Sequence, residues 1–97
     1  MTSLKFNGDI SLEEVYSQNR EIICDSLLKS IFEVYTDNSI KEIDVVKISI
    51  NEVEYLITLG RTKFVSALEQ AISFYENREE YEKCQECLNI INELKKK

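Results

Sequence analysis

The chain has 97 residues, of which 43% are hydrophobic and 31% are charged. This composition is typical of a single small globular domain spanning residues 1–97, and it excludes a disordered chain or two ordinary domains. Eighteen acidic and 12 basic residues give a formal net charge of −6. Because phosphate groups and anionic lipids repel such a chain, we expect no direct nucleic-acid binding and no membrane binding. The charge favours a protein partner with a basic surface, or it merely keeps the domain soluble.

The sequence also predicts where the protein resides. No apolar run approaches the roughly 20 residues of a membrane-spanning helix, and residues 1–8 lack the apolar segment of a secretory signal. The cysteines Cys24, Cys84 and Cys87 are odd in number, which is typical of reduced thiols rather than of a disulfide framework. We therefore expect a cytoplasmic protein.

The first predicted element is a long N-terminal helix over residues 11–36. Ser11 and Glu14 have the spacing of a capping box, and Ile10 and Val15 have that of a hydrophobic staple. The apolar residues of its second half cover more than half of the helix circumference; they are Leu27, Leu28, Ile31, Phe32, Val34 and Tyr35. This half is therefore either central to the core or shared with a partner.

Alternating apolar residues between positions 41 and 59 predict an antiparallel β-hairpin. Leu4 and Phe6 are candidates for a short third strand. A two-residue turn at Asn51 and Glu52 brings three apolar pairs onto one face, namely Val46 with Ile57, Ile48 with Tyr55, and Ile50 with Val53.

Further helical sequence is predicted after Gly60, which ends the second strand. A helix begins near residue 62, a polar segment follows at residues 76–80, and a helical pattern continues to about residue 94. One continuous helix and a hairpin of two helices both fit this pattern. The residues Ala67–Tyr75, Asn77–Tyr81, Cys84 and Leu88 resemble one tetratricopeptide-type helical hairpin, which implies a helical interaction surface.

Together these elements predict an α+β fold whose helices, including a C-terminal helical hairpin, pack on one face of a small antiparallel sheet. The order of the elements and the acidity of the chain resemble those of small phage-encoded inhibitors, including certain anti-CRISPR proteins. This resemblance implies a protein that blocks a site on its target.

Few of the residues are suited to catalysis or metal binding. The chain has no His, which excludes nucleophilic catalysis by Ser or Cys with a His base. Cys84 and Cys87 have the spacing of a zinc or redox pair, but Cys24 is the one further thiol, and the neighbouring glutamates raise thiol pKa values. We interpret Cys84 and Cys87 as small buried apolar side chains and expect no enzyme activity, no catalytic residue, no metal and no cofactor.

The segment from Gly60 to Lys63 lies between a predicted strand and a predicted helix. A single glycine is too few for a phosphate-binding loop. We interpret Gly60 as a turn residue, Thr62 as a helix cap, and Arg61 and Lys63 as cations that promote solubility.

Two candidate partner-binding surfaces remain. The first is an acidic run made of Glu76, Glu79, Glu80, Glu82 and Glu86, of which the second, fourth and fifth share one face of a helix. The second is the stripe Leu28, Phe32 and Tyr35. This stripe is a partner-binding or dimerisation surface if it is exposed and part of the core if it is covered, and its pattern favours the core.

Our hypothesis is that this small acidic protein binds another protein, as an inhibitor or an adaptor, and occludes a basic or nucleic-acid-binding surface. The alternative is a structural or assembly protein that forms a homodimer through its N-terminal helix.

Overall fold

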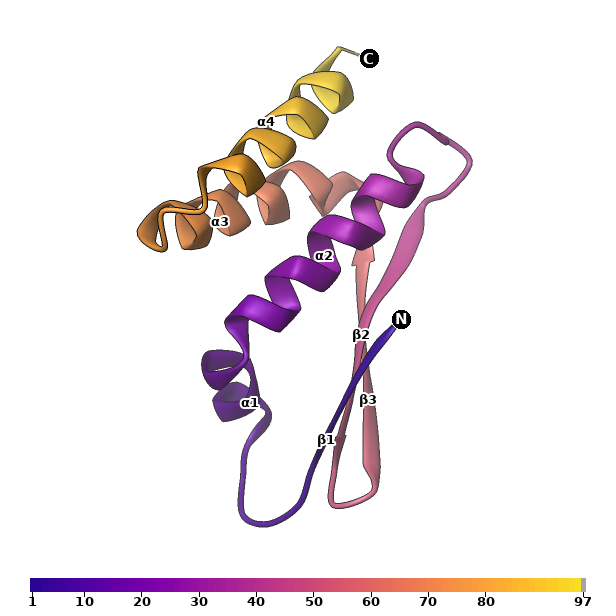
Figure 1. Cartoon of the computed structure of the whole chain (residues 1–97). Helices are drawn as coiled ribbons and strands as arrows, with labels where there is room; N and C mark the ends of the chain where they lie inside the picture. Colours follow the sequence, from indigo (N-terminus) through magenta and orange to yellow (C-terminus); the bar gives the residue numbers. More distant parts are fainter. Residues whose placement is uncertain (97) are drawn as a thin grey trace.

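A computed structural model describes residues 1–96 and shows an α+β domain. Within these residues four α-helices and a three-stranded mixed sheet form, and the helices lie on one side of the sheet (Figure 1). The elements in chain order are β1 (Thr2–Phe6), α1 (Leu12–Gln18), α2 (Arg20–Val34), β2 (Glu42–Ile50), β3 (Val53–Gly60), a 3₁₀ turn (Arg61–Lys63), α3 (Phe64–Asn77) and α4 (Tyr81–Lys95).

The predicted hairpin is confirmed, including its turn and the register of its three apolar pairs, and beyond them the register shifts by one residue between Asp44 and Val46 of β2. Asn51 and Glu52 both adopt positive φ angles, of 49° and 70°, as a two-residue hairpin turn requires. All three predicted apolar pairs face each other across β2 and β3. The Asn51 side chain also donates to the Gly8 carbonyl and accepts from the Gly8 N–H, both at 2.8 Å. This residue therefore fixes the turn and anchors the loop that follows β1.

A third strand is present, but its direction corrects the prediction of an antiparallel sheet. In β1, Leu4 lies opposite Ile48, and the strand runs parallel to β2. Parallel neighbours need a long crossover connection, and α1 and α2 provide it. The sheet is therefore mixed, with β2 at its centre.

The prediction of one long N-terminal helix is wrong, because β1 comes first and the helical segment is divided. The capping box of Ser11 and Glu14 is confirmed and starts α1. Asn19 then leaves helical geometry, with φ −128° and ψ 30°, and its side-chain amide donates to the Val15 carbonyl at 2.8 Å. Asparagine competes for backbone hydrogen bonds in this way, and here it separates α1 from α2.

The core lies between the inner face of the sheet and the helices. Val46 and Ile48 of β2, Ile31 of α2, and Phe64 and Leu68 of α3 are all fully buried within it. The outer face of β2 is more open, as the alternating burial of the strand shows. The helices therefore cover one side of the sheet only, as expected.

Residues 62–94 form two helices rather than one. Glu79 has a positive φ of 59°, and the Glu80 N–H donates to the Tyr75 carbonyl at 2.9 Å. This geometry terminates α3 in the manner of a left-handed C-terminal cap, although a residue other than glycine supplies it. The chain then reverses, and α4 packs along α3.

Arg61 closes the end of α2 and corrects the interpretation of this cation as a solubility residue. Its guanidinium donates to the carbonyls of Tyr35, Ile40 and Asp37 at 2.6, 2.8 and 3.0 Å. Its own N–H donates to the Lys41 carbonyl at 2.7 Å. The interpretation of Thr62 as a cap is also wrong, because no side-chain hydrogen bond caps the start of α3.

Replacing Arg61 by Ala is expected to lower the free energy of unfolding by about 2 kcal/mol, because carbonyls at the end of α2 lose a charged donor. Arg61→Lys should recover only part of this loss, since an ammonium group lacks the planar fork. Urea denaturation measures both effects. Lys63→Ala is the control, and a loss for Arg61→Ala no larger than that of the control would contradict the capping role.

Candidate functional site

The five glutamates of the acidic run occupy different local structures. Glu76 lies on α3, Glu79 in the turn, Glu80 directly before α4, and Glu82 and Glu86 on α4. Because Glu79 is not helical, the predicted helical face of three carboxylates is reduced to two. Glu80 is half-buried and forms ion pairs with Arg78 and Lys83, each at 3.1 Å. The other four glutamates are exposed and make no ion pair within residues 1–96.

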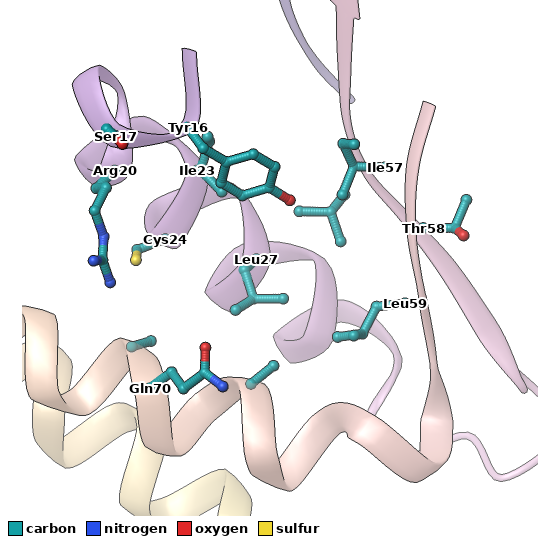
Figure 2. A pocket seen from close by; sticks show the side chains of 13 residues that line it. Tyr16, Ser17, Arg20, Ile23, Cys24, Leu27, Ile57, Thr58, Leu59 and Gln70 are labelled. Carbon is teal, nitrogen blue, oxygen red and sulfur yellow. The ribbon is translucent and has the colours of Figure 1, made fainter. Parts of the chain in front are cut away.

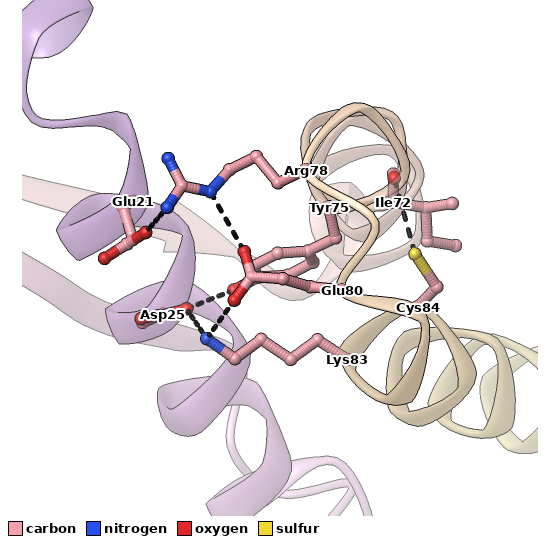
Figure 3. A network of polar contacts seen from close by, with 8 residues as sticks. All are labelled: Glu21, Asp25, Ile72, Tyr75, Arg78, Glu80, Lys83 and Cys84. Atoms are coloured by element: carbon pink, nitrogen blue, oxygen red, sulfur yellow. Dashed lines mark hydrogen bonds and ion pairs between the residues drawn. The ribbon is translucent and has the colours of Figure 1, made fainter.

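A network of polar contacts fixes this acidic end of the helical hairpin against α2 (Figure 3). Asp25 of α2 accepts hydrogen bonds from the Tyr75 hydroxyl at 2.6 Å and from the Lys83 ammonium at 3.1 Å. A second ion pair joins Arg78 to Glu21 of α2. The hydrogen bonds to Glu80 and Asp25 raise the pKa of Lys83. The network therefore joins α2, α3 and α4 and sets the position of the exposed glutamates.

A groove of about 450 Å³ between α2 and α4 brings the two predicted surfaces together. Leu28 is buried in it, with 6% of its surface exposed, whereas Phe32 is 61% exposed. Glu86 reaches the same groove from α4. The Tyr35 ring lies with its centroid 6.1 Å from that of Phe32 and continues the aromatic surface. The stripe on α2 is thus divided between the core and the surface.

Sequence reasoning did not find a second, apolar cleft, which lies between α1, α2, β3 and α3 (Figure 2). Its volume is about 410 Å³, and its lining includes Tyr16, Leu27, Ile57 and Leu59. Figure 2 shows the Tyr16 ring directed toward Ile57 across this cleft. These residues are far apart in the sequence, so no local spacing could have predicted that they meet. The alternation of β3 only assigned Ile57 and Leu59 to the inner face.

All three cysteines are buried, with at most 9% of their surface exposed. Burial raises the pKa of each thiol, and together with Cys84 and Glu86 it raises the pKa of Cys87 to about 12. Within residues 1–96 no group of three or more His, Cys, Asp or Glu side chains has the geometry to hold a metal ion. The interpretation of Cys84 and Cys87 as small buried apolar side chains agrees with this placement, and Cys24 is buried as well.

Two consequences for the thiols can be measured. A thiol reagent at pH 8 should react with the folded protein far more slowly than with the unfolded chain. Reaction of Cys84 or Cys87 in the folded protein at the unfolded rate would contradict the buried interpretation.

The second consequence concerns pH. Because the pKa of Cys87 is raised on folding, the contribution of this thiol to the free energy of unfolding is complete below its unfolded pKa near 9 and is lost as pH rises toward 12.

Comparison with known proteins adds no assignment. No protein-family model matches the chain, and neither a curated protein nor a solved structure is significantly similar to it. Among the helices of residues 1–96, none has the length and apolar character to cross a membrane.

Proposed function

We propose that this protein acts without catalysis by binding another protein through the groove between α2 and α4. The observation that carries the proposal is the position of Phe32, a largely exposed aromatic side chain, beside the free carboxylate of Glu86. A large exposed aromatic side chain next to charged groups is typical of the residues that dominate protein interfaces.

The free carboxylates of α4 beside the groove favour a basic partner. Two lysines line the groove: the ammonium of Lys83 is already paired with Asp25 and Glu80, whereas Lys29 is exposed and makes no ion pair within residues 1–96. Glu82 and Glu86 are exposed on α4, and neither has a cationic partner within residues 1–96. Free carboxylates attract a cationic surface and accelerate association, while burial of Phe32 slows dissociation.

The mechanism that follows is occlusion. A partner whose basic surface normally holds nucleic acid would be covered by the acidic end of the hairpin and by Phe32. An inhibitor or adaptor in the cytoplasm, of phage origin or otherwise, fits this mechanism. The assembly alternative uses the same exposed Phe32, since a homodimer through α2 would bury it.

Removing the free charges tests the proposal. In affinity capture from nuclease-treated lysate, the triple variant Glu79→Gln, Glu82→Gln and Glu86→Gln should lose at least tenfold of the stoichiometric partner retained by the original chain. High salt should release the same partner, because screening weakens interactions between exposed charges.

The matched control carries the same change in net charge at exposed glutamates on other elements, namely Glu13→Gln, Glu42→Gln and Glu69→Gln. This control should retain the partner. Equal retention by both triple variants would contradict a role for the acidic end, and retention by Phe32→Ser would contradict the aromatic anchor.

A further inference from the structure

The strand β3 forms one edge of the sheet and is open along its length. Within residues 1–96 it pairs with β2 on one side and with no strand on the other. Three of its apolar side chains are exposed: Val53 by 54%, Leu56 by 51% and Tyr55 by 40%. A long edge strand with exposed apolar side chains is a template for pairing with another strand.

Three features that prevent edge pairing are missing from β3: a short length, a proline and an unpaired charge. The strand has eight residues and no proline, and its one charged side chain, Glu54, is neutralised by an ion pair with Lys47 at 2.9 Å. The opposite edge, β1, has only five residues and carries the exposed Lys5. The strand β3 is therefore the edge suited to pairing.

The geometry of the hairpin determines which backbone groups face the open edge. In a two-residue hairpin, the two residues that flank the turn exchange hydrogen bonds, and every second residue does so thereafter. The register of β2 shifts between Asp44 and Val46, but the hydrogen bond from Arg61 to Lys41 shows that the alternation along β3 is kept to its far end. The N–H and C=O groups of Glu54, Leu56 and Thr58 consequently point away from β2.

We infer that β3 is a dimerisation strand, on which a second copy of this chain pairs in antiparallel orientation about a two-fold axis at Leu56. The outward backbone groups then form about six hydrogen bonds between the copies. Each Leu56 lies opposite its counterpart, and Glu54 lies opposite Thr58 of the second copy. The pairing is isologous, so it closes at two copies.

Charge and shape both favour a second copy as the occupant. No two like charges lie directly opposite each other in this register, although the chain carries a net charge of −6. On the inner face, Tyr55 of each copy lies opposite Ile57 of the other. Ile57 lines the apolar cleft of about 410 Å³, so the Tyr55 ring of the second copy would cover its mouth.

This inference goes beyond the proposed function, because it concerns a surface on β3 rather than the groove between α2 and α4. It also differs from dimerisation through the N-terminal helix, which requires Phe32. Sedimentation of the purified full chain tests it without any partner protein, so its failure is distinguishable from failure of the proposed function.

The experiment measures the mass of the chain in solution at concentrations up to about 1 mM, where even a weak dimer is populated. We expect twice the monomer mass for the original chain and the monomer mass for Leu56→Glu. Within one copy the new carboxylate lies opposite Lys47, which preserves the fold. Across the two-fold axis it lies opposite the same carboxylate of the second copy, and the two repel each other. Leu88→Glu, at an exposed leucine of α4, is the matched control and should remain dimeric.

A second variant gives a positive signal that does not depend on disrupting the dimer. Leu56→Cys should form a covalent dimer under mild oxidation. Leu88→Cys should not, because position 88 lies on α4, outside the pairing strand. The native thiols are buried and do not compete in either variant. A monomer at 1 mM would overturn the inference, and so would a dimer that survives Leu56→Glu. A dimer dissolved by Phe32→Asp alone would assign the interface to α2 instead.

Discussion

The contact of the Arg61 guanidinium with the end of α2 is the constraint on which the arrangement of the helices depends. Carbonyls at a helix C-terminus have no intrahelical partners, and here one side chain donates to those of Val34 and Tyr35. It also donates to the carbonyls of Asp37 and Ile40 in the loop that follows α2. The same residue begins the 3₁₀ turn that leads into α3 and lies with its guanidinium 5.5 Å from the centre of the Phe64 ring. The direction in which α3 leaves the sheet is therefore fixed relative to α2.

The polar network around Asp25 fixes α2 at a second point, in addition to the contact with Arg61. Arg61 holds one end of α2 near the start of α3, and Tyr75 and Lys83 hold α2 to the end of α3 and the start of α4. With both ends fixed, the surface that contains Phe32 and Glu86 is set by contacts that do not use either side chain. A substitution at Phe32 or Glu86 can therefore report on binding with little effect on the fold.

The sequence-based predictions were correct where the interacting residues are close in the sequence and wrong where they are far apart. The hairpin and the capping box depend on neighbours a few residues apart, and both were predicted correctly. The direction of β1 depends on a partner strand more than 40 residues away, so Leu4 and Phe6 gave no indication that the sheet is mixed. The break at Asn19 lies in the polar segment 17–21 between apolar positions that share one helical face, and nothing in the sequence indicates that the helix is interrupted there. The backbone angles of Asn19 and its side-chain hydrogen bond show the break.

The candidate site shows the same limit. Composition identified the acidic run, but the left-handed backbone at Glu79 removed that residue from the helix. Glu86 and Phe32 line the same groove because α4 lies across from α2, an arrangement that no spacing in the sequence encodes. The function of Arg61 was missed for the same reason, because its acceptors lie more than 20 residues before it.

Carboxyl footprinting of the chain with its captured partner tests the central claim most directly. The account predicts that carbodiimide labelling of Glu82 and Glu86 falls at least severalfold in the complex, while labelling of Glu13, Glu42 and Glu69 does not change. Unchanged labelling of Glu82 and Glu86 in a stoichiometric complex would show that the partner binds elsewhere and would contradict the account.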